Sequence, residues 1–195
     1  MAKAYNPLDY ENLARSVVEA LLNREEEPLA PATSFEGAGV YAVYYHGDFE
    51  PYSKIVGLDP PQPVYVGKAV PTGARKGGLV SSTEGRELNS RLNQHAQSIE
   101  QAENLDLKHF RCRYLVVESV WITLAERFLV EHYQPIWNVV IDGFGNHDPG
   151  AGRRAMKRPR WDILHPGRPW ARKLTAQEST EQVIARLENS FKKRS

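Results

Sequence analysis

The sequence predicts an α+β domain, because short strands and amphipathic helices follow one another in the order β-β-α-β-α. The strands show apolar side chains at every second position, and the helices show apolar residues every three or four positions. The 195 residues suffice for one domain, and 41% hydrophobic with 25% charged residues is an ordinary globular composition. We therefore expect residues 1–195 to form a single domain.

The first half of the chain contains one predicted helix and two predicted strands. Residues 9–23 are amphipathic, and an acidic, proline-containing linker covers residues 24–36. GVYAVYY (39–45) alternates as a strand does, and PVYVG (63–67) is a second strand that could pair with it antiparallel. Residues 69–85 are rich in Gly, Ser and Thr, and a loop of this length in a compact domain is often functional.

The second half supplies two predicted helices, one strand and a basic tail. Helices are expected over residues 86–103 and 121–133, with the strand FRCRYLVVES (110–119) between them. The segment DGFGNHDPGAG (142–152) is Gly-rich and irregular, and the basic C-terminal segment after it ends in a helix near residues 179–192.

The net charge of +1 conceals an uneven distribution. Residues 1–36 carry three basic and seven acidic residues, a net charge of −4. Residues 151–173 carry eight basic residues and one acidic residue, a net charge of +7. This asymmetry suggests a polyanionic partner for the second segment, although a solvated surface with local charge bias explains it equally well.

Targeting and disulfide signals are absent from the sequence. The single cysteine, Cys112, lies in an alternating apolar stretch and is expected to pack in the core of a protein kept in a reducing compartment. The N-terminus lacks a signal-peptide pattern, and no stretch approaches membrane-spanning length, so we expect a cytoplasmic protein without membrane contact. Without CxxC, HExxH, P-loop or GxSxG motifs, zinc, nucleotide and serine-hydrolase chemistry have no support.

Two polar residues interrupt the apolar face of the helix expected over residues 86–103. At about 100° per residue, His95 falls inside the apolar stripe and Arg91 lies at its border, one turn earlier. An inward Arg needs an anion, because an unpaired buried charge is costly. Either a nearby carboxylate and a backbone carbonyl satisfy the two residues, or they belong to a functional site.

The next helix, over residues 121–133, has the opposite anomaly. Glu126 lies among apolar residues, whereas Glu131 points away and can pair with Arg127. A carboxylate that faces a site suits a hard divalent cation such as Mg²⁺. The alternative is a buried ion pair between Glu126 and Arg91.

Two tyrosines complete this group of inward polar residues. Tyr41 lies in the first strand, and Tyr65 begins the YVG of the second. Aromatic residues in strands are usually core residues. Together with an inward Arg, His and Glu, however, they could handle a phosphodiester, because Arg and a metal neutralise charge while a base activates water.

In this order and spacing, the residues resemble the signature of the GIY-YIG nucleases. GVY and YVG are followed by the helical Arg and His, the helical Glu and the Asn of PIWN. The resemblance implies a catalytic core over residues 37–140, with a small antiparallel sheet flanked by helices. Residues 1–36 would then be an N-terminal helix and linker, and residues 141–195 a basic C-terminal extension.

A closer likeness extends over nearly the whole chain. GAGVYAVYY, PVYVGKAVP, ELNSRLNQH, IDGFGNHDPGAGR and WDILHPGRPWA are similar to restriction endonucleases of the Eco29kI type. Those enzymes are homodimers that cut the palindrome CCGCGG. The resemblance implies a Mg²⁺-dependent type II endonuclease that acts on double-stranded DNA as a homodimer, with a cognate DNA methyltransferase in the same system.

The resemblance also assigns roles to individual residues. Tyr41 would be the general base for water or would position it, with His95 removing the phenolic proton or contacting the phosphate. Tyr65 would hydrogen-bond the phosphate, and Arg91 would bind it and stabilise the transition state. Glu126 would be the lone protein ligand of the metal.

Further residues would support the site or contact DNA. Asn138 would support the site through hydrogen bonds, and Lys68 is a possible phosphate contact. Arg and Lys recognise guanine in the major groove, which suits a GC-only target, although most such residues contact phosphate. The candidates for DNA contact in loops are Arg75, Lys76, Arg153 and Arg154. A palindromic site implies a two-fold dimer, in which the N-terminal helix either takes part or packs on its own core.

Two other functions remain open at this point. A homing or repair nuclease with the same signature normally joins the catalytic module to a separate DNA-binding domain, and the segments that flank the core here are short. A catalytically silent DNA-binding protein of the same fold would not need an inward Glu beside a phosphate site.

Overall fold

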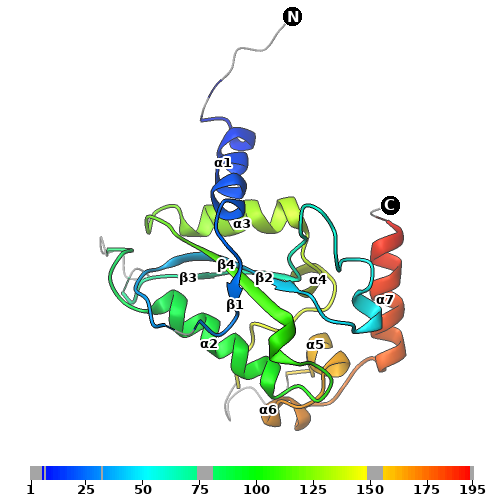
Figure 1. Cartoon of the computed structure of the whole chain (residues 1–195). Coiled ribbons are helices and arrows are strands. Elements are labelled where there is room, and N and C mark those ends of the chain that lie inside the picture. Colours follow the sequence, from blue (N-terminus) through cyan, green and yellow to red (C-terminus); the bar gives the residue numbers. More distant parts are fainter. Residues whose placement is uncertain (1–5, 7, 32, 74–80, 149–155, 194–195) are drawn as a thin grey trace, which may run out of the picture.

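A four-stranded antiparallel sheet lies at the centre of the computed structural model, with the strand order β1-β4-β2-β3 (Figure 1). The structure describes residues 6, 8–31, 33–73, 81–148 and 156–193. The strands are β1 (Glu27–Pro28), β2 (Gly39–Tyr45), β3 (Tyr65–Ala69) and β4 (Phe110–Val116). The predicted pairing of the two tyrosine-bearing strands is confirmed, since β2 and β3 are antiparallel neighbours.

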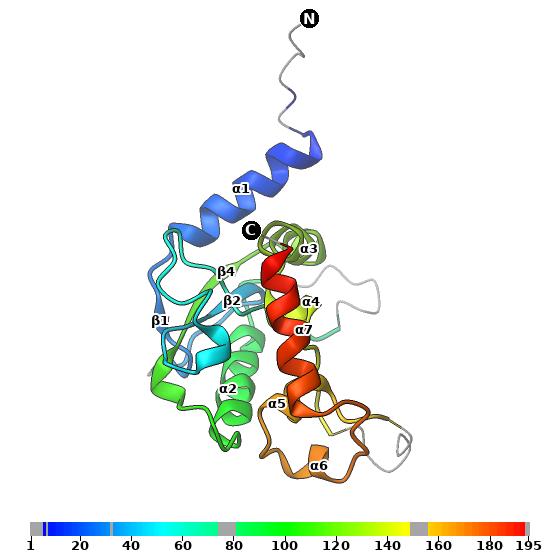
Figure 2. The ribbon, with the colours of Figure 1, turned by 90° about the vertical axis from the view of Figure 1, so that its right-hand side faces the viewer.

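Helices cover both faces of the sheet and confirm the α+β fold class (Figures 1 and 2). One face carries α1 and α3, and the other carries α2 and the C-terminal helices. The longer helices are α1 (Tyr10–Leu22), α2 (Glu87–Glu100), α3 (Ile122–Tyr133) and α7 (Thr180–Lys192). The shorter ones are α4 (Ile136–Val139), α5 (Arg160–Leu164), α6 (Pro169–Arg172) and the 3-10 turns η1 (Glu50–Tyr52) and η3 (Leu107–His109).

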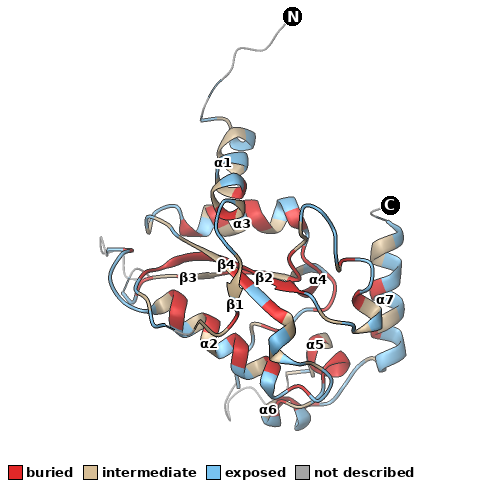
Figure 3. Cartoon of the chain, in the orientation of Figure 1, coloured by how far each residue is buried: buried red, intermediate tan, exposed pale blue. Residues whose placement is uncertain are grey.

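Strand β2 is buried along its whole length and divides the core in two (Figure 3). Val40, Ala42 and Tyr44 pack toward α1 and α3, whereas Tyr41 and Val43 pack toward α2 and the C-terminal helices. This strict alternation follows from the two-residue period of a strand. It also places Tyr41 on the same side of the sheet as α2.

The start of β2 at Gly39 explains where its neighbours end. Gly39 lies opposite Ala69 in β3 and opposite Val116 in β4. The second strand therefore extends to Ala69 rather than ending at residue 67, and the third ends at Val116 rather than at residue 119. These boundaries depend on pairing between strands, which the sequence pattern of one strand does not contain.

The N-terminal helix α1 packs on its own chain, which is one of the two possibilities that the sequence left open. Val18 and Leu21 are buried against α3, and the ring of Tyr10 meets Phe128 edge-on with centroids 4.5 Å apart. In Figure 2, α1 lies above α3 at the top of the molecule. Cys112 is buried, as expected, and burial raises the pKa of its thiol to about 12.

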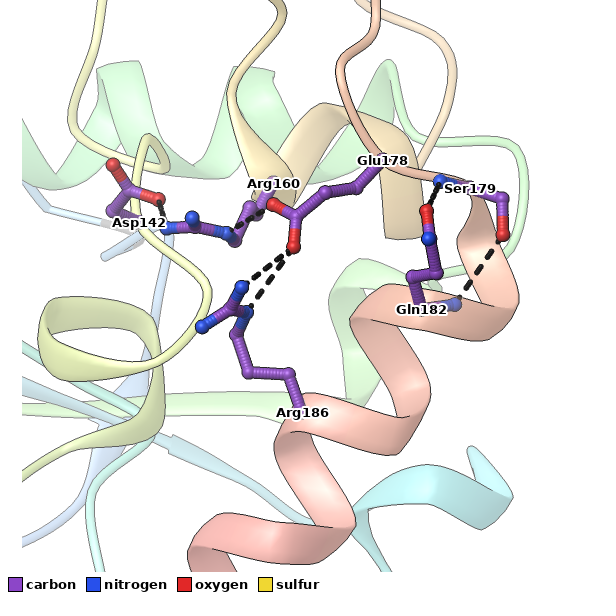
Figure 4. A network of polar contacts seen from close by, with 6 residues as sticks. All are labelled: Asp142, Arg160, Glu178, Ser179, Gln182 and Arg186. Atoms are coloured by element: carbon purple, nitrogen blue, oxygen red, sulfur yellow. Dashed lines mark hydrogen bonds and ion pairs between the residues drawn. The ribbon is translucent and has the colours of Figure 1, made fainter.

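Much of the positive charge in the C-terminal segment is neutralised within the chain. Glu178 accepts hydrogen bonds from Arg160 at 2.5 Å and from Arg186 at 2.7 Å, and Arg160 also pairs with Asp142 (Figure 4). Ser179 begins α7 with a capping box. The net charge of residues 151–173 is therefore larger than the positive charge left free to bind a polyanionic partner.

None of the helices in the described ranges has the length and apolar character needed to cross a bilayer.

Candidate active site

A pocket of about 720 Å³ opens at the β3 edge of the sheet. Because β3 is an edge strand, side chains from both helical layers can reach the pocket around it. The predicted site residues that line it are Tyr41 from β2, Tyr65 and Lys68 from β3, Arg91 from α2 and Glu126 from α3. Residues that lie far apart in the sequence thus share one concave surface.

Tyr41 lines this pocket and forms a buried hydrogen-bonded pair with His95, which is not among the lining residues. The phenolic oxygen of Tyr41 lies 2.6 Å from Nε2 of His95. Tyr41 lies opposite Gly67 in the sheet, and a Cβ atom at position 67 would clash with the Tyr41 phenol. The glycine of YVG is therefore required by the tyrosine of GVY on the neighbouring strand.

Both members of the pair are neutral near pH 7. Burial raises the pKa of Tyr41 well above its ordinary value, and Tyr65 adds to this increase while Arg91 opposes it. Burial lowers the pKa of His95 well below its ordinary value, and the charges of Arg91 and Arg168 act in the same direction. Tyr41 can therefore donate its proton to an unprotonated Nε2 of His95.

Arg91 is held by neutral groups. Its Nη1 donates to Oε1 of Gln94 at 3.1 Å and contacts Nε2 of His147, and its Nη2 donates to the carbonyl of Gly145 at 3.0 Å. Within the part of the chain that the structure describes, no carboxylate pairs with Arg91. Its guanidinium thus keeps its full charge where it faces the pocket, as binding of a phosphate requires.

Glu126 pairs with Lys68, so the alternative of an Arg91–Glu126 ion pair is wrong. Nζ of Lys68 lies 2.6 Å from Oε2 of Glu126, and both side chains are partly exposed. The register of β3 explains the difference. Tyr65 and Gly67 face α2, and Lys68 therefore faces the α3 layer from which Glu126 projects.

The surroundings of Glu126 fit a hydrated divalent cation. The described residues contain no group of three His, Cys, Asp or Glu side chains that could enclose a metal ion. Mg²⁺ commonly takes one or two protein carboxylates and fills its other positions with water and phosphate oxygens. The ammonium group of Lys68 shows that a positive charge is accommodated beside this carboxylate.

Asn138, in α4, holds the edge strand in place. Its Nδ2 donates to the carbonyl of Val66 at 2.8 Å, and its Oδ1 accepts from the amide of Val66 at 2.9 Å. Both outward backbone groups of an edge-strand residue are thereby satisfied. Since Val66 lies between Tyr65 and Gly67, these two bonds fix the backbone on either side of it.

The loop from Gly143 to His147 is part of the site, and the sequence analysis did not identify it. The ring of Phe144 stacks on the imidazole of His95, with centroids 4.5 Å apart, and meets Tyr65 edge-on at 5.1 Å. His147 itself lines the pocket. The sequence signals were its irregular, Gly-rich composition and its place in the stretch IDGFGNHDPGAGR, which is similar to Eco29kI-type enzymes, and neither relates the loop to α2.

Arg168 holds this loop through hydrogen bonds to its backbone. It forms a bidentate ion pair with Asp162 at 2.7 and 2.6 Å and donates to the carbonyls of Gly143, Phe144 and Asn146 at 2.9, 3.0 and 3.1 Å. Its guanidinium carbon also lies over two tryptophan rings, Trp161 at 4.6 Å and Trp170 at 4.7 Å. Arg168 is fully buried, so one of the basic C-terminal residues is a structural element of the site.

Lys68 and four loop residues are the predicted DNA contacts. Arg75, Lys76, Arg153 and Arg154 lie outside the described residues. Lys68 is inside the pocket, where it contacts Glu126.

The antiparallel sheet, the tyrosines on its neighbouring strands and the pocket beside α2 and α3 have the organisation of a GIY-YIG nuclease. The family model of the Eco29kI GIY-YIG domain matches residues 33–191, and the chain belongs to this family. It is a type II site-specific restriction endonuclease. A comparison with curated proteins gives no match.

Proposed function

We propose that this endonuclease hydrolyses double-stranded DNA at the palindrome CCGCGG as a homodimer, with Mg²⁺ bound at Glu126. The family supports the target and the dimer. The observation that carries the chemistry is the neutral Tyr41–His95 pair in contact with a pocket that also presents Arg91 and Glu126. This arrangement combines a proton acceptor, an uncompensated cation and a carboxylate.

In the proposed reaction, Tyr41 and His95 activate the attacking water. As the water oxygen bonds to phosphorus, its proton passes to the Tyr41 oxygen and the phenolic proton passes to Nε2 of His95. The bond from phosphorus to the 3′ oxygen breaks, and that oxygen takes a proton from solvent water, which leaves a 5′-phosphate and a 3′-hydroxyl. This concerted transfer avoids a free phenolate, which burial disfavours strongly.

Charge on the phosphoryl group is balanced by the other pocket residues. Arg91 binds the scissile phosphate, and Tyr65 hydrogen-bonds one of its oxygens. Glu126 would hold a divalent cation, which would supply further neutralisation of charge. Lys68, which pairs with Glu126 in the structure, would then be free to contact phosphate.

The remaining parts of the chain fix this centre and bring DNA to it. Asn138 positions the Tyr65–Gly67 backbone. Basic residues bind the DNA backbone and its bases, with Arg75, Lys76, Arg153 and Arg154 as candidates. The contacts of Arg91 in α2 with Gly145 and His147 of the C-terminal extension support a single unit over residues 1–195. A cognate DNA methyltransferase would protect the host's own sites.

A panel of duplexes tests the proposed target. Duplexes that contain CCGCGG, one symmetric substitution of it or no related site are incubated with the protein and Mg²⁺. We expect both strands of the first duplex alone to be cut, with two protein chains per bound duplex in sedimentation analysis. Cleavage at another sequence would overturn the target but retain the chemistry. Specific binding without cleavage would show a silent DNA-binding protein.

A further inference from the structure

The loop from Gly143 to His147 reaches Arg91 from a part of the chain that lies outside the predicted catalytic core. Two of its groups bind the guanidinium on different nitrogens. The carbonyl of Gly145 accepts from Nη2 at 3.0 Å, and Nε2 of His147 contacts Nη1. Because the guanidinium is planar, contacts with two of its nitrogens fix its orientation as well as its position.

The chemistry of His147 suits an orienting role. Partial shielding of its imidazole from water, with the nearby charges of Arg91 and Arg168, lowers the pKa of His147. A neutral imidazole can accept a hydrogen bond from Arg91 without cancelling its charge, whereas a carboxylate in that place would compete with the phosphate. His147 is itself exposed and has no core function, so packing does not account for its presence.

The loop is also held by contacts of its own, as a support for Arg91 requires. Arg168 binds three of its carbonyl groups, and Phe144 packs against both His95 and Tyr65. The position of His147 is thus set by the same contacts that set the rest of the site. A support of this kind reduces the reorganisation needed when the substrate binds.

We propose that His147 is a positioning residue for the cleavage reaction, which holds the guanidinium of Arg91 toward the scissile phosphate through Nε2. The proposal rests on the role proposed above for Arg91. It predicts that position 147 needs a hydrogen-bond acceptor for Arg91 and does not need a positive charge.

Three variants separate an acceptor from a cation at this position. His147→Gln keeps a neutral acceptor, His147→Lys provides a charge without an acceptor, and His147→Ala removes both. Arg91→Ala is made in parallel. For each protein, the dissociation constant for an uncut target duplex is measured without divalent cation, and the rate of cleavage is measured with enzyme in excess.

We expect the Gln variant to cleave at close to the wild-type rate, and the Ala and Lys variants to cleave about 10- to 100-fold more slowly. The affinity for DNA should be unchanged in the Gln and Ala variants. Rapid cleavage by the Lys variant with slow cleavage by the Gln variant would overturn the proposal and indicate a cationic DNA contact. A wild-type rate for the Ala variant would also overturn it. If Arg91→Ala cleaves normally, the proposed role of Arg91 fails as well, which distinguishes the two failures.

Discussion

The hydroxyl group of Tyr41 lies 2.6 Å from Nε2 of His95, although the two residues come from different elements on one side of the sheet. Burial keeps both groups neutral, so the phenol can donate to the imidazole in the tautomer that leaves Nε2 unprotonated. The hydrogen bond along which a proton can pass from Tyr41 to His95 is therefore present before any substrate binds. This relationship leads directly to the first prediction.

Tyr41→Phe should remove the proton acceptor while it retains the ring that fills the core. We expect cleavage to slow by about 10²- to 10⁴-fold, the usual contribution of a general base. The unpaired Nε2 of His95 should lower the free energy of unfolding by about 1–3 kcal/mol. Single-turnover cleavage and urea unfolding measure the two effects. A Phe variant that is folded and cleaves at the wild-type rate would exclude Tyr41 from the chemistry.

Asn138 should matter for the position of the edge strand. Asn138→Ala leaves the amide and carbonyl of Val66 without their present partners, and we expect a loss of about 1–3 kcal/mol in unfolding free energy. Asn138→Asp keeps an acceptor for the amide but places a carboxylate against the carbonyl, so it should also be destabilised and slow. If either variant retains both stability and activity, the two hydrogen bonds between Asn138 and Val66 are not needed for the site.

Acid should destabilise the protein because buried histidines remain neutral. His165 donates from Nδ1 to Asn104 at 3.0 Å and accepts at Nε2 from Tyr52 at 2.5 Å, and burial lowers its pKa to about 3. In the unfolded chain the same imidazole binds a proton near pH 6.5. Its contribution to stability is therefore complete above pH 6.5 and is lost progressively as pH falls toward 3.

Urea unfolding at pH 7 and pH 5 measures this effect. His165 alone should lower the unfolding free energy by about 2 kcal/mol between the two values, and the lowered pKa of His95 acts in the same direction. His165→Gln cannot titrate, so the loss between pH 7 and pH 5 should shrink by about the same amount. An unchanged loss in this variant would contradict the assignment.

Local periodicity was enough to predict the elements that carry most of the site. GVYAVYY was predicted as a strand over the residues that form β2, and the helical stripe of α2 placed His95 inside and Arg91 at its border. These predictions succeed because burial on one face imposes a period of 2 or 3.6 on the residues themselves. The short helices and β1 are too brief to show any period.

The sequence could not predict which side chains pair with each other when they lie far apart along the chain. Glu126 pairs with Lys68 and not with Arg91, and this choice depends on which face of β3 each residue occupies. Arg168 resembles a surface charge in the sequence, yet it is fully buried against Asp162. His147 lies in an irregular segment, and contacts of the loop with Arg168 and of Phe144 with His95 bring it to Arg91.

The function proposed above makes the pocket at the edge of β3 a metal-dependent phosphodiesterase site. The most direct test is digestion of a plasmid with one CCGCGG site, with and without Mg²⁺, by the wild type, Glu126→Gln and Glu131→Gln. Glu131 lies on the same helix but outside the pocket, so its variant is a matched control. We predict one discrete Mg²⁺-dependent cut by the wild type and the Glu131 variant, and none by the Glu126 variant. Equal cleavage by all three proteins would contradict the assignment of Glu126 and of this pocket as the active site.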